Sequence, residues 1–91
     1  MFYVYVLYSK KDKRLYIGST PDLRKRMVKH NTGYVRSTKH RRPLELIYYE
    51  AYLLKSDCDK REKYLKSGAG RKELAIQLEG IFKKLKYEYS K

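Results

Sequence analysis

The segment from residue 2 to residue 8 carries apolar or aromatic side chains at every position. Alternate side chains of a strand point to opposite faces. The two faces would carry Phe2, Val4 and Val6 on one side and Tyr3, Tyr5 and Leu7 on the other. Because neither face is polar, the pattern predicts a central strand. The polar segment 9–14 predicts a turn, and residues 15–19 predict a second strand that completes a hairpin.

A helix is predicted directly after this hairpin. Thr20 is a candidate N-cap, and Pro21 suits the first helical position, where a missing N–H costs nothing. Gly33 suits the left-handed conformation in which many helices end. We therefore expect a helix that runs to about His30, followed by a basic loop over residues 34–43.

The next segments predict a third strand and a second helix. The strand is expected over residues 44–53. Ser56 and Asp57 are typical of a helix N-terminus, and the helix that they begin should run to about Ser67. The Gly-Ala-Gly sequence of residues 68–70 is expected to break it.

A last helical region is predicted from about Arg71 to Tyr87. Its apolar residues fall on one stripe at helical spacing, and they are Leu74, Leu78, Ile81, Phe82 and Leu85. Gly80 weakens the middle of this stretch, so two shorter helices are the alternative. The order strand, strand, helix, strand, helix, helix predicts an α/β (α+β) fold. We expect a three-stranded antiparallel sheet flanked by helices, in a single domain over residues 1–91.

The charge of the chain directs attention to nucleic acid. The 91 residues include 23 Lys and Arg against 10 Asp and Glu, a net charge of +13 spread along the whole chain. Such an excess repels itself unless a polyanion or counterions compensate it, so nucleic acid is the first partner to consider. A protein that merely tolerates a basic surface is the alternative. No segment pairs a polybasic face with exposed large apolar residues, which disfavours a membrane surface.

Other composition features exclude several classes of protein. Cys58 is the single cysteine, so an internal disulfide framework and a cysteine zinc site are both excluded. The apolar runs are too short to span a membrane, and the N-terminus lacks the pattern of a secretory signal. We therefore expect a cytoplasmic protein, either a monomer or a weak homodimer.

Three charged or titratable residues fall on helix stripes that should face the sheet. Arg26 and His30 extend the stripe of Leu23, and Glu62 lies between the apolar residues of the second helix. Burying such groups costs free energy unless a partner compensates it. The alternatives are ordinary ones: Arg26 snorkels past the core edge, His30 is a satisfied edge histidine, and Glu62 pairs with a neighbour such as Lys66.

The order and spacing of these residues resemble the GIY-YIG endonuclease family. Tyr3-Val4-Tyr5 is followed after ten residues by Tyr16-Ile17-Gly18, and then by Arg26, His30 and Glu62. The resemblance covers nearly the whole chain. It is greatest to the small stand-alone members, which are similar to the N-terminal nuclease domain of the UvrC repair protein.

The resemblance implies a metal-dependent endonuclease that hydrolyses phosphodiester bonds in DNA, with repair or recombination intermediates as candidate substrates. Tyr5 or Tyr16 would help to deprotonate the attacking water, and Arg26 would clamp the scissile phosphate. His30 would relay protons or orient a tyrosine, and Glu62 would hold one Mg²⁺ or Mn²⁺ ion.

Basic residues other than these are expected to contact backbone phosphates of the nucleic acid. Such contacts would make nucleic-acid binding salt-sensitive, with weak sequence preference. These basic residues are Arg24, Lys25, Arg36, Lys39, Arg41 and Arg42.

Two departures from the family pattern leave other functions open. Tyr3 stands in place of the first glycine, and residues 67–71 stand where many members carry an asparagine. The second departure motivates an alternative, a nucleic-acid-binding module that lacks or barely keeps cleavage. A third hypothesis is an interaction protein that docks to an acidic partner through residues 36–42.

Overall fold

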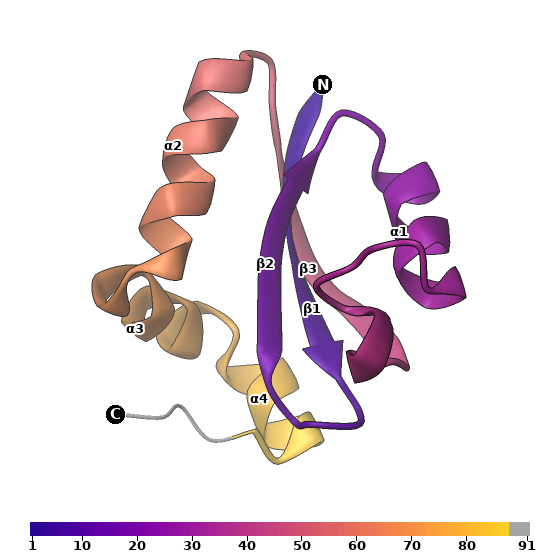
Figure 1. Ribbon diagram of the computed structural model, residues 1–91. Coiled ribbons are helices and arrows are strands. Elements are labelled where there is room, and N and C mark those ends of the chain that lie inside the picture. Colours follow the sequence, from indigo (N-terminus) through magenta and orange to yellow (C-terminus); the bar gives the residue numbers. More distant parts are fainter. Residues whose placement is uncertain (88–91) are drawn as a thin grey trace.

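The computed structural model describes residues 1–87, in which an antiparallel sheet lies between two layers of helices (Figure 1). The strands are β1 (Phe2–Ser9), β2 (Leu15–Thr20) and β3 (Leu44–Tyr52), in the order β2-β1-β3. One face is covered by α1 (Leu23–Thr32) and the other by α2 (Lys55–Lys66), α3 (Gly68–Gln77) and α4 (Glu79–Leu85). A short 3₁₀ helix, η1 (Lys39–Arg41), precedes β3. The predicted α+β fold is confirmed.

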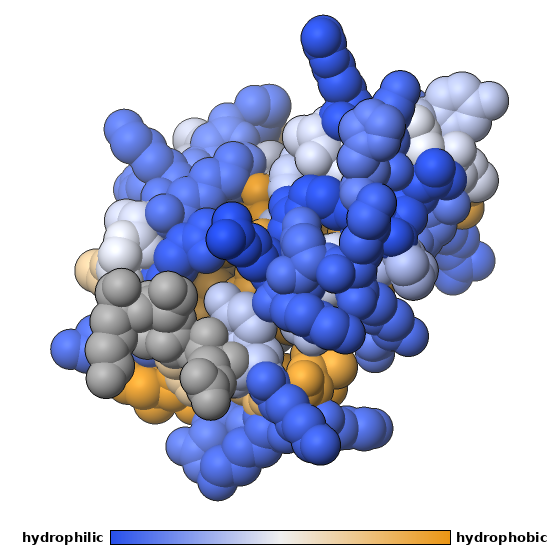
Figure 2. All heavy atoms as spheres, turned by 60° about the horizontal axis from the view of Figure 1, so that its bottom comes forward, coloured by the Kyte–Doolittle hydropathy of each residue, from blue (hydrophilic) through white to orange (hydrophobic). Residues whose placement is uncertain are grey.

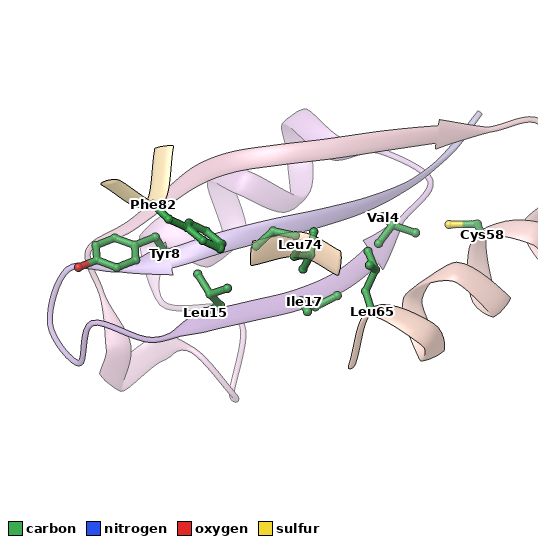
Figure 3. Packing of buried hydrophobic residues seen from close by; sticks show 9 residues of the cluster. Val4, Tyr8, Leu15, Ile17, Cys58, Leu65, Leu74 and Phe82 are labelled. Atoms are coloured by element: carbon green, nitrogen blue, oxygen red, sulfur yellow. The ribbon is translucent and has the colours of Figure 1, made fainter. Parts of the chain in front are cut away.

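Strand β1 is central, as its apolar pattern predicts, because each of its faces packs against a separate core. Val4 and Val6 lie in the larger core, between the sheet and helices α2 to α4. Figure 3 shows side chains of this core from two strands and three helices pointing toward one another. Tyr5 and Leu7 lie in a smaller core under α1. The absence of polar alternation in β1 is therefore the signature of a strand that is covered on both sides.

The helix starts differ from the predictions, whereas one helix end agrees with them. Asp22, and not Thr20, caps α1, because its side chain accepts a hydrogen bond from the backbone N–H of Lys25. Thr20 belongs to β2 instead. Helix α2 begins at Lys55, ahead of the predicted Ser56–Asp57 cap, and has no side-chain cap. Gly33 ends α1 in the left-handed conformation, with φ of 86°, as predicted.

The turn between α2 and α3 is tighter than predicted. Ser67 both ends α2 and caps α3, because its hydroxyl accepts from the backbone N–H of Gly70. Residues 68–70 therefore form the first turn of α3 and do not separate two helices. The last helical region divides into α3 and α4 at Leu78, so the two-helix alternative is correct. Within residues 1–87 no helix has the length and apolarity needed to cross a membrane.

Gly70 is required by this tight turn, and its replacement by alanine is expected to destabilise the fold. A Cβ at Gly70 would lie 2.0 Å from the backbone oxygen of Tyr64 and 2.6 Å from Cα of Leu65. Backbone atoms cannot rotate away, so we expect Gly70→Ala to lower the free energy of unfolding by about 3 kcal/mol.

A urea titration checks this expectation, with Gly80→Ala as the matched control. A Cβ at Gly80 would meet no atom within 4 Å, so that change should stabilise α4 by up to about 1 kcal/mol. Equal unfolding midpoints for the two variants would contradict the role assigned to Gly70.

Candidate active site

Strands β1 and β2 and helix α1 bring three aromatic side chains together on one face of the sheet. Tyr5 pairs with Gly18 across the hairpin, so Tyr16, two residues from Gly18, shares its face. His30 reaches this face from the last turn of α1. The ring centroids of Tyr5 and Tyr16 lie 5.5 and 5.2 Å from that of His30, and 6.3 Å from each other. The two tyrosines and the histidine therefore form one cluster on this face of the sheet.

Gly18 makes room for the hydroxyl of Tyr5. A Cβ at Gly18 would lie 2.6 Å from the Tyr5 oxygen and 3.0 Å from Cε2 of Tyr16. The glycine therefore does more than lead the chain into the turn before α1. The absence of a side chain at Gly18 leaves room for the Tyr5 hydroxyl, which bonds to His30.

A continuous chain of hydrogen bonds joins Arg26 to Thr38 through this cluster. Arg26 Nε donates to the Tyr5 hydroxyl over 3.3 Å, and that hydroxyl lies 2.7 Å from His30 Nε2. His30 Nδ1 lies 2.7 Å from Thr38 Oγ1. Tyr5, His30 and Thr38 are fully buried. Because a neutral imidazole donates at one nitrogen and accepts at the other, Tyr5 and Thr38 together set where its proton resides.

The surroundings keep both His30 and Tyr5 neutral at pH 7. Burial, with a smaller contribution from the Arg26 charge, lowers the pKa of His30 from 6.5 to about 4. Burial also raises the pKa of Tyr5, although the hydrogen bond from Arg26 opposes the rise. Tyr5 is therefore not a resident tyrosinate, and a basic role for it requires that its proton pass to His30.

Glu62 lies at the edge of β2, next to this cluster. Its Oε1 accepts a hydrogen bond from Ser19 Oγ over 2.7 Å, and its Oε2 accepts from Lys66 Nζ over 2.7 Å. The pair with Lys66, which is the ordinary alternative to a metal-binding role for Glu62, is therefore present. Burial opposes ionisation, but Lys66 and Ser19 hold the pKa of this carboxyl below its usual value. Its charge also contributes to the raised pKa of Tyr5, so the carboxylate acts across the strand edge.

The chemistry of the donors at this site fits a divalent metal ion. Residues 1–87 contain no cluster of three or more His, Cys, Asp or Glu side chains, so no all-protein metal cage is present there. Mg²⁺ commonly binds through one or two carboxylates together with substrate phosphates and water. Glu62 is ionised and only half-buried, so it offers one such carboxylate to a shared ion.

The predicted phosphate contacts on α1 divide between two sides of the helix. Lys25 and Arg26 line a groove of about 380 Å³ with Lys29, which we call the basic groove. Lys29 was not among the predicted phosphate-binding residues. It lies four residues after Lys25 and therefore on the same side of α1. Arg24 instead lines a separate hollow with Tyr3 and Tyr49.

The four predicted basic residues of the loop also differ from one another. Arg36 and Lys39 are exposed. Arg41 pairs with Asp12 and donates to the backbone oxygen of Leu15. Arg42 donates to the backbone oxygen of Lys39 and lies against Gly33. Arg41 and Arg42 therefore also tie the loop to the rest of the fold.

Two residues that hold the site escaped the sequence-based reasoning. Thr38 lies in an irregular loop, where no periodicity indicates which side chain turns inward. Ser19 could have been found, because alternation along β2 places it on the face opposite Gly18 and toward the second helix. Both supply hydroxyl groups that orient a titratable side chain.

The lowered pKa of His30 predicts acid sensitivity of the fold. The unfolded chain binds a proton at His30 below about pH 6.5, whereas the folded chain does so only near pH 4, so stability falls as the pH drops through this window. We expect a loss of about 2 kcal/mol between pH 7 and pH 5, above the range where carboxylates ordinarily titrate. Urea unfolding at each pH measures it.

The variant His30→Gln should abolish this dependence of stability on pH between 7 and 5. His40→Gln is the matched control, because His40 is exposed in η1, and it should retain the full dependence. An unchanged slope in His30→Gln would show that another group is responsible.

The fold and this site define a class of catalytic domain. Residues 1–74 match the model of the GIY-YIG catalytic domain, and the chain belongs to that family. It is 40% identical to a UPF0213 protein of Staphylococcus saprophyticus over 86% of this chain and 95% of the relative. It is 36% identical to a UPF0213 protein of Clostridium perfringens over 97% and 95% of the two chains.

A solved structure agrees with these matches. The solution NMR structure of a UPF0213 protein from Bacillus halodurans is 30% identical, covers 99% of this chain and 98% of its own, and has a TM-score of 0.55. The resemblance drawn from the sequence is thereby confirmed. GIY-YIG membership points to nuclease activity, which in this family generally depends on a divalent metal ion.

Proposed function

We propose that the chain is a Mg²⁺- or Mn²⁺-dependent endonuclease that hydrolyses phosphodiester bonds in DNA, with repair or recombination intermediates as substrates and a cytoplasmic location. The observation that carries the proposal is the hydrogen-bonded chain from Arg26 through Tyr5 and His30 to Thr38, with Glu62 at the adjacent strand edge. Titratable groups with shifted pKa values, such as this buried histidine between two hydroxyl groups, cluster at functional sites.

Each side chain of the site has a part in this chemistry. The Tyr5 hydroxyl is buried in this structure, so substrate binding must first expose it to the attacking water. It then accepts a proton from that water while its own proton passes to His30 Nε2 over the 2.7 Å hydrogen bond. Thr38 holds the imidazole in place for that transfer. Arg26 stabilises the charge that develops on the phosphate. Tyr16, whose ring lies near both Tyr5 and His30, orients the water.

Glu62 completes the site as the carboxylate that would hold the metal ion. When bound, such an ion stabilises negative charge on the phosphate and on the leaving oxygen. Lys66 donates a hydrogen bond to one oxygen of this carboxylate, and that bond must break before the oxygen can bind a metal ion. The positive groups of the basic groove support nucleic acid as the substrate, because they surround Arg26 on the surface of α1.

A cleavage assay tests the proposal. End-labelled single-stranded, duplex and branched DNA of one sequence, and the matching RNA, are incubated with the protein in Mg²⁺, in Mn²⁺ and in EDTA. We expect metal-dependent products from at least one DNA structure, and no products in EDTA. A Tyr5→Phe preparation, which loses the hydroxyl but keeps the ring, should bind DNA normally and leave it intact.

The alternative is a binding module that has lost cleavage, and the ion pair between Lys66 and Glu62 is the observation that favours it. Salt-sensitive binding without products in either metal would establish that alternative. Failure to bind any nucleic acid at low salt would instead support a protein that docks to an acidic partner through residues 36–42.

A further inference from the structure

A second concentration of positive charge lies beside the hairpin turn. Three arginines from separate segments line one hollow of about 650 Å³: Arg14 follows the β1–β2 turn, Arg41 ends η1, and Arg71 lies in α3. Asp12, Leu15 and Tyr87 complete the lining. We call this feature the arginine hollow. Figure 2 views the molecule from this end and shows hydrophilic side chains over most of the face, with hydrophobic atoms between them.

Among residues 1–87, the charges of the arginine hollow are only partly compensated. Arg41 forms an ion pair with Asp12. Arg14 and Arg71 form no ion pair with any residue in the range 1–87, which leaves two guanidinium charges at one hollow. Bringing like charges together costs free energy unless an anion offsets it. Guanidinium groups offer forked donors that match phosphate oxygens.

The arginine hollow and the active site are joined through β2 and the loop before β3. Arg41 donates to the backbone oxygen of Leu15, the neighbour of Tyr16. The same loop supplies Thr38 to His30. From Ser19, which holds Glu62, to Leu15 the strand covers about 13 Å at 3.3 Å per residue. That is roughly four steps of a duplex at 3.4 Å each, so one strand of nucleic acid can reach both places.

We propose that the arginine hollow binds a phosphate group of the strand that is being cut, a few nucleotides from the scissile bond. The inference rests on the proposed function and adds a second anchor point to it. The sequence-based set contained Arg41 but neither Arg14 nor Arg71, which are 57 residues apart in the chain. The hollow selects DNA that continues beyond the cleavage point along β2, so it sets a minimum substrate length on that side.

The first test measures DNA binding in EDTA, where cleavage does not interfere. The double variant Arg14→Ala/Arg71→Ala should bind about tenfold more weakly than the parent at moderate salt. The slope of log K against log salt should fall by about one unit, as expected for one lost phosphate contact. The matched control is Lys11→Ala/Lys72→Ala, which removes two exposed charges from the same turn and the same helix, outside the hollow.

The second test locates the phosphate. A series of oligonucleotides carries one uncharged methylphosphonate linkage at successive positions, and a parallel pair carries a 5′-phosphate or a 5′-hydroxyl end. In the parent, a methylphosphonate at one internal position should weaken binding. The same substitution should have no effect on binding by the double variant. Sensitivity confined to the 5′ end would assign the hollow to a terminal phosphate.

The outcomes separate this inference from the proposed function. Equal affinities and salt slopes for the double variant and its lysine control would overturn the arginine hollow, whether or not the parent cuts DNA. Weaker binding by the double variant, in a parent that never cleaves, would keep the phosphate site and reject the nuclease.

Discussion

Arg26→Ala is expected to reduce the rate of DNA cleavage by at least about 100-fold, the usual cost of losing one preorganised donor to a developing anion. The guanidinium lies at the wall of the basic groove and donates to the Tyr5 hydroxyl, so it acts on both the phosphate and the proposed base. Its side chain is only half-buried. We therefore expect the unfolding midpoint to change little while activity is lost.

Two comparisons make the Arg26 experiment specific. Lys25→Ala removes a neighbouring charge that lines the same groove, so it should weaken binding modestly and leave the turnover of bound DNA nearly unchanged. Arg26→Lys keeps the charge but loses the forked donor, and it should remain strongly impaired. Single-turnover rates, with the enzyme in saturating excess over the DNA, measure the cleavage step in both variants. Activity in Arg26→Ala equal to that of Lys25→Ala would exclude a catalytic part for Arg26.

Glu62→Gln is expected to abolish metal-dependent cleavage, again by at least about 100-fold, because several kcal/mol of charge stabilisation depend on the ion. The amide is nearly isosteric, and its oxygen can still accept the hydrogen bond from Ser19, so the fold should persist. DNA binding in EDTA should be unchanged or slightly stronger, since one negative charge is removed.

The partner of Glu62 provides an opposite control. Lys66→Ala frees the second carboxylate oxygen, so cleavage should reach half of its maximum at a lower Mg²⁺ concentration than in the parent. Rates measured over a range of Mg²⁺ concentrations compare the variants with Glu79→Gln, which alters an exposed carboxylate of α4. Full activity in Glu62→Gln would remove Glu62 from the metal site and require another ligand.

Much of the fold follows from patterns within single segments. The apolar residues on both faces of β1 identify the central strand, because only a strand covered on two sides avoids polar positions. Gly33 marks the end of α1 since glycine adopts a positive φ without a steric penalty. Local signals fail at helix starts, where Thr20 and Asp22 compete to cap α1 and the register of β2 decides between them.

The members of the candidate site were found from the sequence in the same local way. Helical spacing puts Arg26 and His30 on one stripe, whereas Tyr5 and Tyr16 were singled out by the order of residues that resembles the GIY-YIG family. A helix stripe is a property of one segment and a motif is a property of residue order, so both can be recognised without the tertiary structure.

The contacts between segments were decided only by the tertiary structure. Ser19 meets Glu62 across 43 positions of sequence, and Thr38 turns inward from a loop that has no periodicity. Arg14 and Arg71 reach one hollow from opposite ends of the chain. Periodicity determines which way side chains point within one helix or strand. Contacts between side chains of different elements depend on how those elements pack. The sequence by itself thus determined which side chains are available for phosphate chemistry, and the packing of α1, α2 and η1 around β2 decided which of them act together.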